Sequence, residues 1–145
     1  MRKRGSDTDQ SNRRRSVTDG GLDTEELLEI TRKRISANII ADIVGHPRQG
    51  PTVEEIVYMN PAHSHAEIHS CLSELSKKGV ISERQIASHT RCPDLPSAYF
   101  VITDAARSLF DQNGLFPTQP WRRQYQAVTK ADRIQTIEQL PRSVD

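Results

Sequence analysis

The chain has 145 residues, of which 34% are apolar, and its formal net charge is +1. This length suits one ordinary domain with tails. A core of this size gives the folded chain only a small free energy of unfolding, and burial of surface in a dimer would increase it. The first 21 residues hold six basic and three acidic side chains, against 14 basic and 16 acidic in the remainder. A uniformly basic nucleic-acid-binding body is therefore excluded, and any DNA surface must be a local patch.

Cysteine content and hydropathy narrow the class further. Two cysteines, Cys71 and Cys92, are too few for a disulfide framework. No apolar run approaches the ~20 residues of a membrane span, and the N-terminus lacks the apolar segment of a secretory signal. We expect a cytoplasmic protein with no membrane partner. Phosphate loops, nucleophile elbows and HExxH motifs are missing too, so we expect no enzymatic activity and no cofactor.

The first segment, residues 1–21, is polar and charged and ends in Gly20-Gly21. Such a segment buries too little apolar surface to order itself, so we expect a disordered basic arm. Its two basic clusters either touch phosphates or solvate the terminus, and the sequence alone favours solvation.

Apolar residues at three- and four-residue steps predict helices in the next part of the chain. One helical stretch is expected from about Thr24, with acidic residues in its first turn, to Gly45. A short helix capped by Thr52 follows. It ends at Asn60-Pro61, because the residue before a proline avoids the helical region.

The third helix is the most informative, and we expect it over residues 64–78. Ser64 followed three residues later by Glu67 is a capping box, and Gly79 suits the position just after a helix. An apolar stripe runs along one face: Ile68, Leu72 and Leu75.

The pattern then changes to that of a β-hairpin, with strands near residues 80–86 and 98–102. Thr103 caps another helix that ends near Gly114, and a C-terminal helical unit follows. The predicted fold class is mainly α with a small β-hairpin. The predicted divisions are an arm at 1–21, a domain at 22–115 and a helical extension at 116–145.

Two runs of this sequence carry a resemblance to a known class of proteins. The first is Ser64-His65-Ala66-Glu67-Ile68 with Leu72, Leu75 and Gly79-Val80-Ile81, which resembles the recognition helix of bacterial and archaeal winged helix-turn-helix regulators. The groups concerned are those named for arsenic, multiple-antibiotic and phenolic-acid repressors. The second run, Ala98 to Ala106, is similar to their second wing strand and following helix, although these families often have glycine where this chain has Ala106.

The resemblance covers roughly residues 32–116 and implies a winged helix-turn-helix with N- and C-terminal helical extensions. It also implies a transcription regulator, most simply a repressor, that binds double-stranded DNA as a homodimer. The helix at 64–78 would lie in the major groove, and the wing at 82–102 on the backbone or in the minor groove.

The chemistry of the outer face of the third helix fits this role. Small or hydrogen-bonding side chains allow close approach to base edges, and basic ones contact phosphates. The candidate contacts are Ser64, His65, Ala66, His69, Ser70, Ser73 and Lys77 on the helix, with Arg84, His89 and Arg91 in the wing. If the helix is considered alone, its outer side chains are better explained as an ordinary solvent-exposed face than as DNA contacts. The charged residues of the wing are explained equally well as DNA contacts and as solubilising charges of a loop. Glu67 and Glu74 count against strong binding because carboxylates repel phosphates.

Two alternatives stay open. His65 and His69 place imidazoles on adjacent turns, a pair able to ligate zinc, nickel or copper in a metal-responsive regulator. The paired-cysteine motif of such regulators is missing, and a cysteine beside an apolar stripe, such as Cys71, is usually a small core residue. The other alternative is a winged-helix protein–protein interaction module that binds no DNA, which the near-neutral charge favours.

Apolar stripes at residues 22–30 and 121–140 have no obvious mate in so small a domain, and such stripes usually bury against a partner. We expect a homodimer. The candidate interface residues are Leu27, Ile30, Trp121, Tyr125 and Val128. The alternative is that both segments pack back on their own winged helix.

Overall fold

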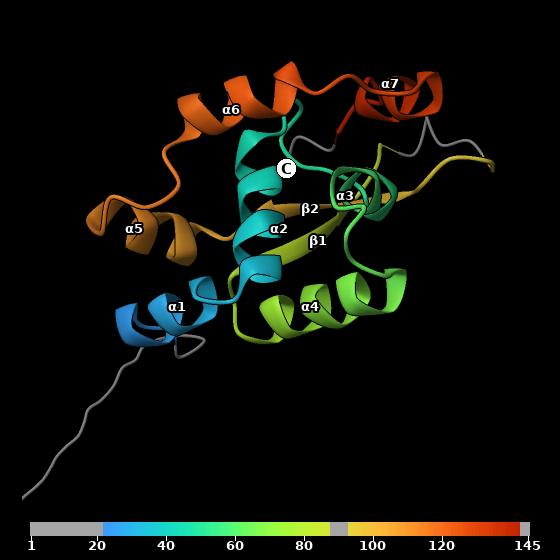
Figure 1. Ribbon diagram of the computed structural model, residues 1–145. Coiled ribbons are helices and arrows are strands. Elements are labelled where there is room, and N and C mark those ends of the chain that lie inside the picture. The colour runs from blue at the N-terminus through green and yellow to red at the C-terminus, as the bar shows by residue number, and fades with distance from the viewer. Residues whose placement is uncertain (1–21, 88–92, 143–145) are drawn as a thin grey trace, which may run out of the picture.

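The computed structural model describes residues 22–87 and 93–142 (Figure 1). The predicted arm and two predicted wing contacts, His89 and Arg91, lie outside the described residues. The described helices are α1 (Thr24–Thr31), α2 (Arg34–Gly45), α3 (Val53–Met59), α4 (His65–Lys77), α5 (Asp104–Gln112), α6 (Thr118–Ala127) and α7 (Asp132–Glu138). The strands are β1 (Ile81–Gln85) and β2 (Ala98–Ile102).

The single helix expected from Thr24 to Gly45 is in fact two helices. α1 ends at Thr31 with Arg32 as its C-cap, and Lys33 adopts an extended backbone conformation before α2 begins. The apolar spacing continues across this break because both helices turn their stripes toward the same core. Leu27 and Ile30 of α1 are buried in it.

The helix-turn-helix formed by α3 and α4 begins with caps that the sequence predicts correctly. Thr52 and Glu55 form a capping box at α3, and Ser64 and Glu67 form one at α4. Each box satisfies backbone donors that the first turn of a helix leaves unpaired. Gly79 follows α4 with φ +81, a left-handed conformation that favours glycine, and turns the chain into β1.

The hairpin is a two-stranded antiparallel sheet in which Ile81 pairs with Ile102 and Gln85 with Ala98. Its first strand buries Ile81, and its second buries Tyr99 and Phe100. The hairpin therefore contributes to the same core as the helices.

The C-terminal helices pack on the winged helix. α6 lies along α2 so closely that a Cβ on Gly45 would come within 2.5 Å of the Trp121 carbonyl oxygen, and α7 contacts α3. In Figure 1, α6 and α7 lie at the top of the molecule and α4 at the bottom. The extension thus covers the side remote from α4.

This packing corrects the reason given for a dimer interface. Leu27, Ile30 and Tyr125 are 0%, 5% and 2% exposed within a single chain, so these three side chains pack against other residues of their own chain. Trp121 is half-buried against the core, and Val128 is 42% exposed. The homodimer itself stays a prediction, but the apolar stripes at residues 22–30 and 121–140 no longer support it.

Among the described helices, none combines the length and the apolar character that a membrane crossing requires.

Candidate nucleic-acid interface

The exposed face of α4 lies opposite its buried stripe. Ile68, Cys71, Leu72 and Leu75 face the core. The side chains predicted to contact DNA are all exposed: Ser64, His65, Ala66, His69, Ser70, Ser73 and Lys77. The helix thus presents a row of small and hydrogen-bonding groups to solvent, the chemistry that close approach to base edges requires.

The two glutamates of α4 have partners within the chain. Glu67 accepts the backbone N–H of Ser64 at 2.8 Å, and this bond lowers the pKa of its carboxyl. Its Oε1 also lies 3.7 Å from Nδ1 of His63. Glu74 lies 3.4 Å from the Lys33 ammonium and 3.8 Å from that of Lys78. These neighbours offset part of the phosphate repulsion expected from the sequence.

The structure adds basic residues that the sequence reasoning missed. Lys33 and Arg34 are exposed at the start of α2, and the contact between Lys33 and Glu74 places this turn beside α4. The available signal was the run Arg32-Lys33-Arg34, three successive basic residues that span the end of α1 and the start of α2. Together with Lys77 these side chains provide positive charge at the border of the exposed α4 face.

Arg84 is the predicted wing contact that the structure describes. It is exposed on β1, where it pairs in register with Tyr99. Glu83 beside it is exposed as well, so the described part of the wing carries both signs of charge. The contact of Arg84 with DNA stays a prediction.

The histidine pair of α4 does not join a larger ligand group in the described residues. The cluster of three potential ligands found there is His46, Glu55 and Glu138. Cys71 is buried, its Sγ lies 3.4 Å from the Ser36 hydroxyl oxygen, and burial raises the pKa of its thiol. It therefore behaves as a core residue and offers no accessible third ligand beside His65 and His69.

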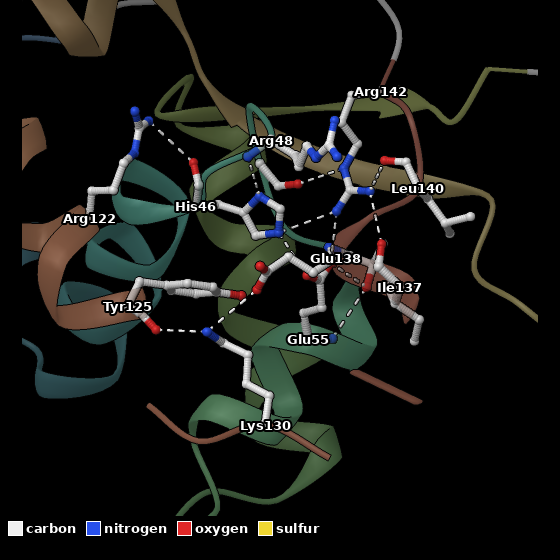
Figure 2. Close-up of polar contacts among 12 residues, drawn as sticks. His46, Arg48, Glu55, Arg122, Tyr125, Lys130, Ile137, Glu138, Leu140 and Arg142 are labelled. Carbon is white, nitrogen blue, oxygen red and sulfur yellow. Dashed lines mark hydrogen bonds and ion pairs between the residues drawn. The ribbon is translucent and has the colours of Figure 1, made fainter. Parts of the chain in front are cut away.

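The His46 cluster is an internal ion-pair network (Figure 2). Arg142 donates from Nη2 to the Glu55 carboxylate at 2.9 Å, and these side chains are 1% and 0% exposed. Nδ1 of His46 accepts the backbone N–H of Arg48 at 3.0 Å, so Nε2 carries the ring proton and donates it to Glu55 at 2.7 Å.

The ionisation states of this network follow from its surroundings. Burial lowers the pKa of His46 and outweighs the opposing effect of Glu55. Burial acts to raise the pKa of Glu55, but the hydrogen bonds from His46 and Thr52 and the charge of Arg142 leave it below its usual value. A neutral histidine between the Glu55 carboxylate and the Arg142 guanidinium results, and the third member of the cluster, Glu138, lies 3.4 Å from the Lys130 ammonium. A metal ion would have to displace the Nε2 proton and Arg142, so the residues present do not suit a metal centre.

The described architecture is a winged helix-turn-helix fold. A solved protein "with a GntR superfamily winged-helix-turn-helix domain" from Halomicrobium mukohataei is similar to this chain, with a TM-score of 0.74 and 22% identity. The similarity covers 90% of this chain and 92% of that one. No protein-family model matches the sequence, and no curated protein matches it either. The likeness confirms the predicted fold class but gives no support to the arsenic, multiple-antibiotic or phenolic-acid groups.

Proposed function

We propose that this protein is a transcription regulator that binds double-stranded DNA, with α4 in the major groove and the hairpin on the backbone or in the minor groove. The observation that carries the proposal is the α4 face. Its polar or small residues Ala66, Ser70, Ser73 and Lys77 are all exposed, while the opposite face is fixed in the core and leaves the helix one orientation.

Exposed basic side chains that could contact phosphates border this face. Lys77 lies at the end of α4, and Lys33 and Arg34 lie at the neighbouring start of α2. Such contacts fix a protein on the duplex without reading sequence, and base contacts supply the specificity. Because the row on α4 contains few strong base-reading side chains, one monomer would bind with modest affinity. A homodimer reading two half-sites about 34 Å apart would add the missing affinity, and repression by occupancy is the simplest regulatory outcome.

The direct test is a selection of genomic fragments by the purified full chain, followed by fluorescence anisotropy on the selected duplex at two salt concentrations. Ser70→Glu combined with Ser73→Glu places two carboxylates in the groove, and we expect it to weaken binding at least about 100-fold, since desolvated like charges repel. The matched control adds the same charge on remote exposed positions of α5 and α7, through Ser108→Glu with Thr136→Glu.

The control is expected to keep its affinity to within a few-fold, and circular dichroism checks that both variants fold. Survival of binding in the Ser70 and Ser73 variant would show that the assigned face is wrong. A chain that acts only as a protein–protein module gives no binding with the steep salt dependence that counterion release imposes. Light scattering on the free and DNA-bound protein measures the proposed homodimer separately.

A further inference from the structure

A cavity of about 240 Å³ opens between α2, the end of α3 and α6. Its walls include Asp42 of α2, Asn60 at the end of α3, and Trp121 and Tyr125 of α6. None of its lining residues belongs to the exposed face of α4. The cavity is thus separate from the candidate nucleic-acid interface, and the proposal below does not depend on DNA binding.

Asp42 is the one charged side chain among the residues that line this cavity. Asn60, itself 5% exposed, donates from Nδ2 to Asp42 Oδ2 at 2.8 Å and to the Ile56 carbonyl oxygen at 2.7 Å. This second bond fixes the amide, which in turn holds the carboxylate in place. A carboxylate held in a cavity without a basic neighbour in its walls is costly to ionise unless a cation joins it.

The remaining walls combine apolar surface with neutral polar groups. Met59, Trp121 and Val128 supply apolar surface, and Asn38 and Gln124 supply neutral amides. A water molecule takes ~30 Å³ in the liquid, so the cavity has room for about eight groups of that size. That volume is below the usual range for drug-sized ligands, which indicates a compact occupant.

We propose that this cavity binds a small organic molecule that carries a protonated amine. The ammonium group donates a charge-assisted hydrogen bond to Asp42, and the apolar part of the molecule packs against Trp121, Met59 and Val128. A hydrogen bond between two charged groups is roughly twice as strong as a neutral one. A divalent metal ion fits less well, because these cations require several oxygen ligands and Asp42 is the one carboxylate in the walls.

The chain carries its own reporter for this site, because Trp121 is its one tryptophan and lines the cavity. Tryptophan fluorescence is measured while the full chain is titrated at pH 8 with benzylamine or isobutylamine. Benzyl alcohol, which has the shape of benzylamine without the charge, is the matched control ligand. We expect a saturable change with at least one amine, and at least about tenfold weaker binding of benzyl alcohol.

Asp42→Asn tests the charge without removing the hydrogen bond from Asn60. We expect this variant to bind the amine at least about tenfold more weakly and benzyl alcohol unchanged. Asp132→Asn, at an exposed position at the start of α7, is the control variant and keeps the affinity of the unmodified chain. Circular dichroism and thermal melting confirm that each variant is folded.

A pH series gives an independent readout. Burial raises the pKa of Asp42 to about 7, partly offset by the bond from Asn60, and burial also raises the pKa of Tyr125, the other titratable wall residue. Amine affinity should therefore rise between pH 6 and pH 8 as Asp42 ionises, and stay flat in Asp42→Asn. The proposal is overturned if neither amine gives saturable binding, if the alcohol binds as tightly as the amine, or if Asp42→Asn leaves amine affinity unchanged.

Discussion

Replacing Arg142 with alanine should destabilise the fold more than any surface change. The guanidinium donates to the carbonyl oxygens of Gly50 at 3.0 Å, Ile137 at 3.1 Å and Leu140 at 2.7 Å. It also pairs with the buried Glu55 carboxylate. Alanine leaves that carboxylate charged without its cation, a change that costs ~3–5 kcal/mol in buried pairs. Natural domains have a total stability of about 5–15 kcal/mol, so this loss removes a large share of it.

Urea unfolding followed by far-ultraviolet circular dichroism measures the effect. With a urea dependence of about 2 kcal/mol per molar, a loss of ~4 kcal/mol lowers the midpoint by about 2 M. Arg123→Ala on the exposed side of α6 is the control, and it should stay within about 0.5 kcal/mol of the unmodified chain. A loss below about 1 kcal/mol for Arg142→Ala would refute the reasoning, since a buried unpaired carboxylate costs more than that.

A double-mutant cycle separates the ion pair from the packing of the arginine stem. Glu55→Gln removes the negative charge, and Arg142→Met removes the positive charge while it keeps the apolar stem. We expect the double variant to be more stable than the sum of the two single losses indicates, because neither charge is then left alone. Strict additivity would show that the two groups do not act as a pair.

Three further predictions concern titration and salt. Asp42→Asn should stabilise the chain by about 4 kcal/mol more at pH 8 than at pH 4, because the pKa of Asp42 rises from 3.8 in the unfolded chain to about 7 in the folded one, so ionisation opposes folding. An equal effect of the substitution on urea unfolding at pH 8 and pH 4 would contradict this. In the Asp42→Asn variant, acidification from pH 7.5 to 5.5 should lower the free energy of unfolding, because His46 has a lower pKa in the folded chain than in the unfolded chain, which therefore binds the proton first. A free energy of unfolding that stays constant or rises on acidification would exclude a neutral buried His46. Lys77→Ala should weaken DNA binding equally on all sequences and lower the slope of log affinity against log salt by about 0.9 per monomer, and an unchanged slope would remove Lys77 from the phosphate contacts.

Local features of this fold could be predicted from the sequence because their physical causes are local. The capping boxes at Thr52 and Ser64 join residues three apart, and the α4 face follows from the apolar spacing within one helix. The break between α1 and α2 could not be predicted in this way. Arg32 and Lys33 form it where the apolar spacing runs on unbroken, so periodicity alone gave one helix.

Long-range contacts account for what the sequence left undetermined. Glu55 has the position of an ordinary first-turn carboxylate, and only its contact with Arg142, 87 residues later, makes it the centre of a buried network. Likewise, Lys33 lies beside α4 because it contacts Glu74, which is 41 residues later in the sequence. Neither pairing leaves a signal in hydrophobic periodicity, because charged residues at helix ends are normally solvated.

The packing of the C-terminal helices changes the basis of the dimer prediction. Their apolar residues Tyr125, Ile134 and Ile137 are buried within the same chain, so the extension enlarges the core that the composition made look small. These apolar residues therefore need no second subunit to bury them. What remains in favour of a homodimer is the weak base-reading chemistry of α4, which needs two half-sites for useful affinity. The dimer and DNA-binding predictions are thus linked. If the chain binds its selected duplex tightly as a monomer, the inference that α4 makes only weak contacts with bases is refuted.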